Sequence, residues 1–239
     1  MTPAYIESEE MLHSREPRGL GGHFYGAYPG LVLDVRDQDG QGRVLVSLPW
    51  SPDSGGSSYS AWARVATMMA GDNQGSWFVP DVGVEVLLIF LGGDPRQPCV
   101  IGALWNGQDA PPQKMDNAGE NNIKKLQSRN GVAMTLDDTQ GAEALTLETP
   151  GDRTISMLDG PGSIEISDSL GNSIKLDESG ITFTTSGQIS MSASQVEITA
   201  GSVTVNAGMS QFNGATQHDT VLTTSIVATS YTPGAGNML

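Results

Sequence analysis

The sequence of 239 residues is poor in cysteine, aromatic residues and long apolar runs. Its one cysteine, Cys99, cannot form a disulfide within the chain, and its apolar neighbours favour a small buried side chain over a reactive thiol. The longest apolar run, Val86 to Leu91, is far shorter than the roughly 20 residues of a membrane-spanning helix. The N-terminus lacks the basic and apolar segments of a secretory signal. We therefore expect synthesis in the cytoplasm without a signal peptide.

Positive charge is also scarce. The chain has 12 Lys and Arg against 27 Asp and Glu, a formal net charge of −15. Binding to nucleic acid or to anionic lipid depends on clustered Lys and Arg, so neither is expected as a main partner. Charged residues make up only 16% of the chain and aromatics 6%, while Gly reaches 30 residues. This composition is typical of a turn-rich β protein and not of a compact enzyme.

The composition changes along the chain. All four Trp lie before residue 126, and beyond Ser179 the only charged side chains are Glu197 and Asp219. We expect an N-terminal arm over residues 1–23, a first domain over 24–108, a linker or neck over 109–130 and a second domain over 131–239.

Residues 24–108 alternate short β-type segments with turn signals. The expected strands are 31–35, 43–48, 61–66, 75–79, 85–90 and 99–105. About six short strands in this length suit a small closed barrel, which also leaves no free edge for aggregation. Gly42 and Gly83 are expected in tight turns.

Beyond residue 131 an internal repeat appears. Pairs of apolar residues separated by one polar residue recur, with first positions 10, 9, 10, 7, 8, 7 and 7 residues apart. Such alternation indicates strands with one apolar face. The pairs are Leu145 and Leu147, Ile155 and Met157, Ile164 and Ile166, Ile174 and Leu176, Ile181 and Phe183, Ile189 and Met191, Val196 and Ile198, and Val203 and Val205.

One strand per repeat cannot enclose a core by itself. A closed homotrimer solves this problem, because the inward residues of three chains meet on a threefold axis. We expect an intertwined, triangular β-helix in which each chain moves to the next side at each turn, with the sixteen paired residues as the trimer core. Since the steps shorten along the chain, the rod is expected to taper.

Several motifs carry a family resemblance. Asp39-Gly40-Gln41-Gly42-Arg43-Val44, the segment Ala61 to Ala66, the segment Phe78 to Leu87 and the segment Val100 to Gly107 resemble the OB-fold domain of phage baseplate assembly protein V and of VgrG spike proteins. The repeat and the ending Tyr231 to Asn237 look like the spike of that family. The resemblance implies an all-β chain, an OB-fold barrel followed by a trimeric β-helix.

The resemblance also implies a role and partners. The expected function is a structural, non-enzymatic central spike on the baseplate of a contractile tail, in a virion or tailocin particle. This spike would cap the tail tube and pierce the outer membrane of the target cell. A separate hub protein would bind the N-terminal side. A PAAR-type tip protein would sit on the C-terminal apex, on Pro233, Gly234, Ala235, Gly236 and Asn237.

The sequence offers little for catalysis, and no cofactor is expected. The adjacent carboxylates Asp137-Asp138 and Asp177-Glu178 are predicted to lie in turns, because neighbours on a strand point to opposite faces. Some spikes of the family hold an axial iron through a His-x-His motif, whereas this chain has His218 alone in the matching stretch, so His218 remains only a weak candidate axial ligand.

Four further interpretations stay open. A carbohydrate-binding or carbohydrate-cleaving tailspike has similar trimeric rods but needs an exposed groove with carboxylates and aromatics. An OB-fold that binds single strands is disfavoured by the charge. The four Trp residues are expected in the barrel core or as trimer contacts, and Arg43, Arg64 and Glu85 in ion pairs between strands or subunits.

Overall fold

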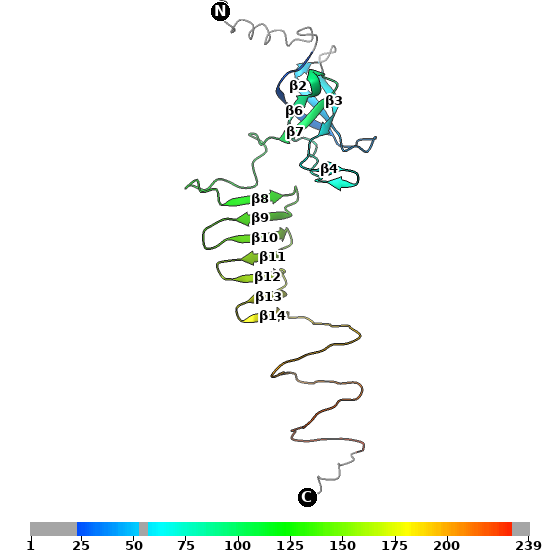
Figure 1. Ribbon diagram of the computed structural model, residues 1–239, viewed down its shortest axis with the longest axis vertical. Coiled ribbons are helices and arrows are strands. Elements are labelled where there is room, and N and C mark those ends of the chain that lie inside the picture. The colour runs from blue at the N-terminus through cyan, green and yellow to red at the C-terminus, as the bar shows by residue number, and fades with distance from the viewer. Residues whose placement is uncertain (1–22, 53–56, 231–239) are drawn as a thin grey trace, which may run out of the picture. The chain divides into compact units, whose positions relative to one another are not determined.

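The computed structural model describes residues 23–52 and 57–230. The chain divides into two units, residues 1–188 and 189–239. The first unit contains a closed barrel and a separate seven-stranded sheet (Figure 1). Most of the expected N-terminal arm, and all of the expected tip-binding residues Pro233 to Asn237, lie outside the described residues.

The barrel consists of five strands in the order β1-β2-β3-β7-β6. Their bounds are β1 Ala27–Asp34, β2 Val44–Pro52, β3 Ser58–Val65, β6 Glu85–Phe90 and β7 Pro98–Ala103. All neighbouring pairs are antiparallel except β3 and β7, which are parallel and close the ring. A five-stranded closed barrel is the architecture of an OB fold, as the sequence predicted.

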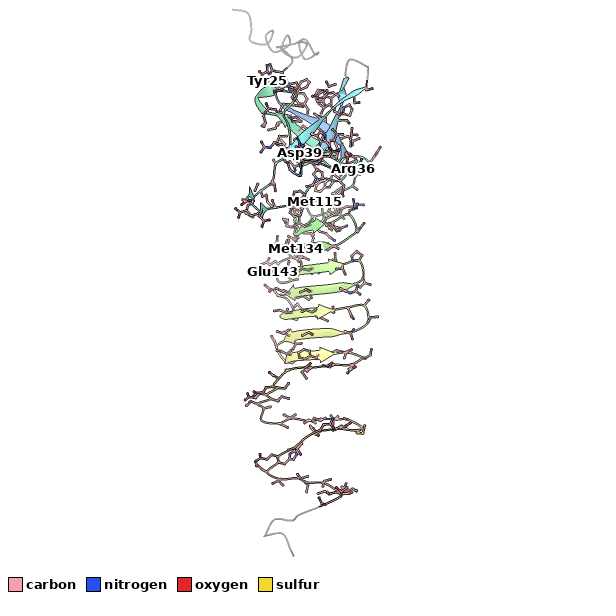
Figure 2. All side chains as sticks on the ribbon, turned by 90° about the vertical axis from the view of Figure 1, so that its right-hand side faces the viewer. Tyr25, Arg36, Asp39, Met115, Met134 and Glu143 are labelled. Carbon is pink, nitrogen blue, oxygen red and sulfur yellow. The ribbon has the colours of Figure 1, made fainter. Side chains whose placement is uncertain are left out.

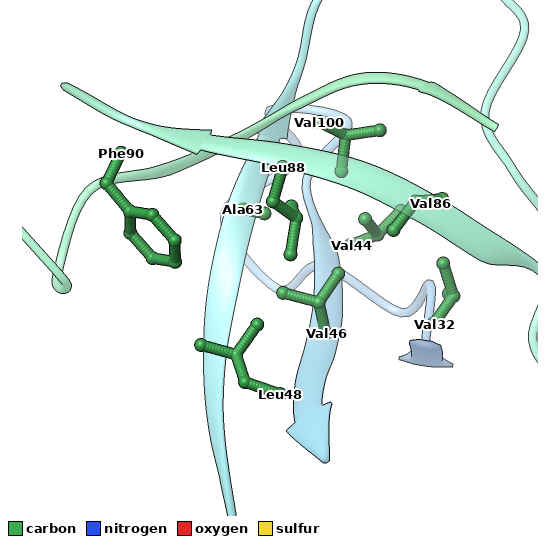
Figure 3. Packing of buried hydrophobic residues seen from close by; sticks show 9 residues of the cluster. All are labelled: Val32, Val44, Val46, Leu48, Ala63, Val86, Leu88, Phe90 and Val100. Carbon is green, nitrogen blue, oxygen red and sulfur yellow. The ribbon is translucent and has the colours of Figure 1, made fainter. Parts of the chain in front are cut away.

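Alternation along the strands builds the barrel core. The buried cluster, shown in Figure 3, comprises Val32, Val44, Val46, Leu48, Ala63, Val86, Leu88, Phe90 and Val100. Three of these residues come from every second position of β2 and three from every second position of β6, because alternate side chains of a strand point to the same face. Gly30 on β1 lets this strand pack closely against β6, since a Cβ at residue 30 would lie 2.6 Å from Cδ1 of Leu88.

The turn predictions at two glycines are confirmed. Gly42 has φ 69° and Gly83 has φ 91°, values that favour glycine over residues with a Cβ. The strand expected over residues 75–79 is wrong, because that stretch holds only the end of a two-stranded ribbon, β4 Ala70–Gly71 and β5 Gln74–Gly75. A short 3₁₀ helix, Leu91–Gly93, follows β6. Within the described ranges no helix has the length and apolar character to cross a membrane.

The second sheet runs in strict sequence order from β8 to β14. Its strands are β8 Ile123–Gln127, β9 Ala133–Asp137, β10 Ala144–Thr149, β11 Arg153–Leu158, β12 Ser163–Ser167, β13 Ser173–Asp177 and β14 Gly180–Thr184. The sheet thus begins at Ile123, inside the stretch that the sequence analysis assigned to the linker.

This sheet corrects one detail of the expected spike. Each strand pairs antiparallel with its neighbour in sequence, so over Ile123–Thr184 the chain folds back on itself in a meander. The sequence analysis expected the chain to move to the next side at each turn. The turns here are short, from two to six residues, and such connections favour hairpins over crossings.

Candidate functional site

The most distinctive surface of the sheet is one apolar face. Residues directly opposite in an antiparallel sheet share a face, as do residues two apart along a strand. The register places the paired apolar residues in two columns that run across all seven strands. One column holds Leu126, Met134, Leu147, Ile155, Ile166, Ile174 and Phe183; the other holds Lys124, Leu136, Leu145, Met157, Ile164, Leu176 and Ile181.

Ten of the expected trimer-core residues, from Leu145 to Phe183, therefore lie together on one face. The columns also contain Leu126, Met134 and Leu136, which the sequence analysis did not select. Met134 is labelled on the sheet in Figure 2. The signal was present, because Ala133 to Asp137 reads Ala-Met-Thr-Leu-Asp, with the same apolar-polar-apolar alternation. The repeat simply starts two strands earlier than the expected first pair.

The apolar face is open to solvent in the single chain. Eleven of its side chains, from Leu126 to Phe183, keep between 36% and 63% of their surface exposed. The only hydrophobic cluster among the described residues is the barrel core, and no other described layer covers the sheet. A sheet with one apolar face is stable only when that face is buried against another layer. The face is therefore an interaction surface.

The opposite face of the sheet is polar. The register aligns Lys125, Thr135, Thr146, Ser156, Glu165, Lys175 and Thr182 in a third column. Glu165 stands directly opposite Lys175, and Lys125 Nζ forms an ion pair with Glu148 at 3.2 Å. No aromatic side chain stands in this column. Such a face is suited to water.

The described part of the second unit, residues 189–230, continues the apolar pattern without forming strands. The backbone bends at residues 194, 201, 208, 214, 219, 224 and 229, so the interval shortens from seven residues to five. Figure 1 shows this yellow-to-red segment turning back and forth as an open chain. The expected strands from Ile189 to Val205 are therefore absent from a single chain, since none of their backbone groups has a partner there.

The apolar residues of this segment are strongly exposed. The six expected core residues here, Ile189, Met191, Val196, Ile198, Val203 and Val205, are between 59% and 77% exposed. Further exposed apolar residues, which the sequence analysis did not select, follow at Met209, Phe212, Val221, Leu222, Ile226 and Val227. This segment cannot bury its apolar side chains within one chain, so it too is a candidate interaction surface.

The paired carboxylates lie where strands end, so the prediction of turns is only partly confirmed: Asp137 and Asp177 are the last residues of β9 and β13, and Asp138 and Glu178 follow them outside the strands. Asp137 accepts hydrogen bonds from the backbone N and the hydroxyl of Thr139, and Asp177 accepts the same two bonds from Ser179. The Ser179 hydroxyl and the Lys175 ammonium lower the pKa of Asp177 to about 2. Both carboxylates are held as ionised turn-formers, a role opposite to that of a general acid, whose pKa must be raised.

The barrel's charged residues form local pairs. Asp37 accepts bonds from the backbone N of Gln41 at 2.8 Å and from the Arg43 guanidinium at 2.7 Å, and the Arg43 bond holds the pKa of Asp37 well below its usual range. The Arg43 pair therefore lies within one loop between β1 and β2. Glu85 accepts a bond from Asn106 at 2.9 Å, whereas Arg64 joins no ion pair within the described ranges.

The Trp residues do not form the barrel core. None belongs to the buried cluster, so that part of the expectation is wrong, while a role in trimer contacts stays a prediction. Trp50 stacks on Tyr28 with ring centroids 4.6 Å apart, and its indole donates to the Pro29 carbonyl at 2.7 Å. Trp77 and Trp105 are 77% and 70% exposed.

Two other residues that the sequence analysis considered are Cys99 and His218. Cys99 on β7 is half-buried and contacts the Val100 carbonyl at 3.8 Å, so it is less enclosed than expected. His218 is exposed in the second unit, and its role as an axial ligand stays a prediction. Within the residues that the structure describes, no group of three or more His, Cys, Asp or Glu is placed to hold a metal ion.

Comparison with known proteins matches both parts of the chain. Residues 28–105 match the type VI secretion system/phage-baseplate injector OB domain. Residues 144–215 match the phage baseplate V C-terminal trimerisation domain. The second match spans β10 to β14 and continues into the exposed apolar segment of the second unit, the two regions whose apolar side chains lack a covering layer.

Individual relatives agree with these matches. The chain is 32% identical over 126 residues to the type VI secretion system spike protein VgrG1b of Pseudomonas aeruginosa, covering 50% of this chain and 17% of the relative. It is 34% identical over 114 residues to VgrG1a of the same species, covering 45% and 18%. It is 30% identical over 118 residues to the actin cross-linking toxin VgrG1 of Vibrio cholerae, covering 48% and 11%. The chain thus spans less than a fifth of the length of these relatives.

Proposed function

We propose that this chain, which carries the OB domain and the trimerisation domain of the baseplate V and VgrG-like spike proteins, forms the homotrimeric central spike of a contractile injection machine. The observation that supports this most directly is the apolar face of the β8–β14 sheet. Three copies of that face, brought together about an axis, would form one enclosed core and leave the polar column outside.

The second unit would be completed in the same way. Over the described residues 189–230 the backbone forms no strand pairing, the apolar side chains are exposed, and the chain bends at regular, shortening intervals. Three such chains wound about one axis would supply each other's hydrogen bonds in every layer. This is the region in which we place the intertwining expected from the sequence. Separating one chain would then break bonds along the whole length, which is the property a piercing rod requires.

The proposed role is mechanical and not catalytic. The carboxylates of Asp37 and Asp177 have lowered pKa values, the opposite of what a general acid requires, and the relatives matched here are chiefly named as spike proteins. One relative is named as an actin cross-linking toxin, but the match covers only 11% of it. We further propose a place at the baseplate of a tail-like particle, a hub protein on the N-terminal side and a PAAR-type tip protein on Pro233 to Asn237.

The test is the state of the purified full chain in solution. Light scattering after size exclusion should give three times the chain mass of 25.1 kDa, and negative-stain images should show slender particles. A stable monomer with an ordered, compact profile would overturn the proposal. Binding of a separately purified PAAR-type protein to the trimer, and loss of that binding when residues 233–237 are deleted, would test the proposed tip partner.

A further inference from the structure

The turns of the β8–β14 sheet form two edges of different charge. We define the acidic edge as the turns after β9, β11 and β13 together with the last residues of β9 and β13. Its carboxylates are Asp137, Asp138, Glu143, Asp159, Asp177 and Glu178. We define the arginine edge as the turns after β8, β10 and β12 together with the first residue of β11. Its charged residues are Arg129, Asp152, Arg153 and Asp168. The acidic edge thus has six carboxylates, and the arginine edge has two carboxylates balanced by two guanidinium groups.

Part of the acidic edge is neutralised within the chain. Lys124 pairs with Asp138 at 3.5 Å, near the first strand, and Lys175 pairs with Asp177 at 3.1 Å, near the last. The middle of the edge, at the level of β10 and β11, is different. Glu143 and Asp159 lie side by side there, because the backbone N of Asp159 donates to the Glu143 carbonyl at 2.9 Å. Neither carboxylate joins an ion pair within the described ranges.

The arginine edge has, at the same level, a cation that forms no close ion pair within the described ranges. Arg153 is the first residue of β11, and Asp159 follows the last residue of that same strand. Arg153 is exposed, and none of the ion pairs among the described residues includes it. Its guanidinium donates only a long bond, 3.5 Å, to the Gly151 carbonyl and interacts at longer range with Asp168. The two ends of β11 therefore carry charges of opposite sign, and neither charge forms an ion pair within the described ranges.

Threefold closure brings these two ends together. Around a closed ring, each copy of the sheet presents its acidic edge to the arginine edge of the next copy, and all copies stand at the same height. The start of β11 in one copy then faces the end of β11 in the next. We propose that Arg153 of each chain pairs with Asp159 of the next chain, beside Glu143, at each of the three corners. This inference rests on the proposed homotrimer.

Such a pair would favour one height of each chain against the next. The apolar columns repeat with little change from strand to strand, so a slip by two strands, about 10 Å, still sets apolar side chains against apolar side chains. A slipped contact does not close and leads to an open screw assembly instead of a ring. Between Asn130 and the C-terminus the only cations are Arg153 and Lys175, and Lys175 is already paired. A slip by two strands would set Arg153 beside the carboxylates after β9 or β13, where Asp138 and Asp177 already pair with lysines. The aligned ring instead gives Arg153 the pair Glu143 and Asp159, neither of which forms an ion pair within the described ranges.

The test is a charge exchange between chains, made in the full-length protein. Arg153→Glu and Asp159→Arg are each expected to lower the thermal midpoint of trimer dissociation, and the double variant to recover most of the loss. Arg153→Glu also changes the interaction with Asp168 in the same chain. Mixing the two single variants distinguishes that effect from the pairing between chains. When the two single variants are unfolded together and refolded, every mixed corner is attractive again, so native mass spectrometry should show mixed trimers enriched several-fold over the statistical ratio.

The outcomes separate this inference from the proposed function. A wild-type chain that is not trimeric overturns the proposed function itself. A wild-type trimer whose single variants dissociate normally, or whose mixed trimers form only in the statistical ratio, overturns the corner pair and leaves the trimer standing. Enrichment that fades at high salt supports the pair, because exposed ion pairs are screened.

Discussion

Leu147→Asp is the sharpest probe of the apolar face. Leu147 lies on β10 in the middle of one apolar column, directly opposite Met134 and Ile155, and is 40% exposed in the single chain. Complete burial of a leucine is worth about 1.5–3 kcal/mol, so covering the exposed part contributes roughly 1 kcal/mol per chain. The substitution removes this contribution three times over in a trimer.

The carboxylate adds a larger cost. Each buried ion carries an effective desolvation penalty of several kcal/mol, and three like charges would face one another near the axis. The sum is on the order of 10 kcal/mol per trimer, comparable to the whole stability of a typical domain, about 5–15 kcal/mol. We expect Leu147→Asp to yield monomers or aggregates at neutral pH, measured by light scattering after size exclusion.

The neighbouring residue supplies the matched control. Thr146 is on the same strand but in the polar column on the other face, so Thr146→Asp adds the same charge one residue away and should leave the trimer intact. Leu147→Asn removes the apolar side chain without adding charge and should fall between the two. A Leu147→Asp trimer with the thermal midpoint of wild type would refute the assignment of this face to the trimer core.

Other predictions follow from separate parts of the chain. Ile189→Asp, in the second unit, should also prevent a stable trimer, as measured by analytical ultracentrifugation, whereas Ser190→Asp should not; equal behaviour of the two would contradict the inward position of Ile189. Gly42→Ala should destabilise the barrel by about 1–2 kcal/mol in denaturant unfolding, because Gly42 has φ 69° and the added Cβ would lie 2.9 Å from Trp77. Gly102→Ala, with open space at its Cβ, should be nearly neutral. The reverse order of the two variants would refute the turn argument. Hydrogen bonds from Arg36 lower the pKa of Asp34 to about 2, and the Ser179 hydroxyl and Lys175 do the same for Asp177. A carboxylate whose pKa is lowered in the folded state stabilises the fold at pH values above its unfolded pKa, near 4. The melting temperature should therefore not respond to these groups above pH 5 and should fall between pH 4 and pH 2. Asp177→Asn should flatten that fall, and an unchanged slope would contradict the assignment.

Much of the fold could be read from alternation. The sequences of β2 and β6 place apolar residues at every second position, which is enough to predict strands and their buried faces. The expected strand at residues 75–79 failed because Trp77, Phe78 and Val79 have strong β propensity, yet the chain there has no neighbouring strand to pair with beyond a two-residue ribbon. Propensity is local, whereas strand pairing depends on distant residues.

The candidate surface was predictable in composition but not in arrangement. The spacing of pairs such as Ile155 with Met157 and Ile164 with Ile166 showed that one face of the repeat is apolar. Spacing alone did not show whether consecutive strands fold back or pass to another side, because both paths give the same alternation. The register showed that consecutive strands fold back, since each pair lies directly opposite the pair of the next strand in the same chain. It also added Leu126, Met134 and Leu136 to the face.

The sequence by itself determined the chemistry of this protein: an acidic, β-forming chain whose apolar side chains alternate and whose charges fade toward the C-terminus. Only the tertiary structure decided where these residues lie relative to one another. It placed the apolar pairs in two continuous columns, left them uncovered, and set Arg153 and Asp159 at opposite ends of one strand. The reason is physical, because side-chain alternation is a property of one strand, whereas columns and edges exist only after the hydrogen-bonded register has fixed which strands are neighbours.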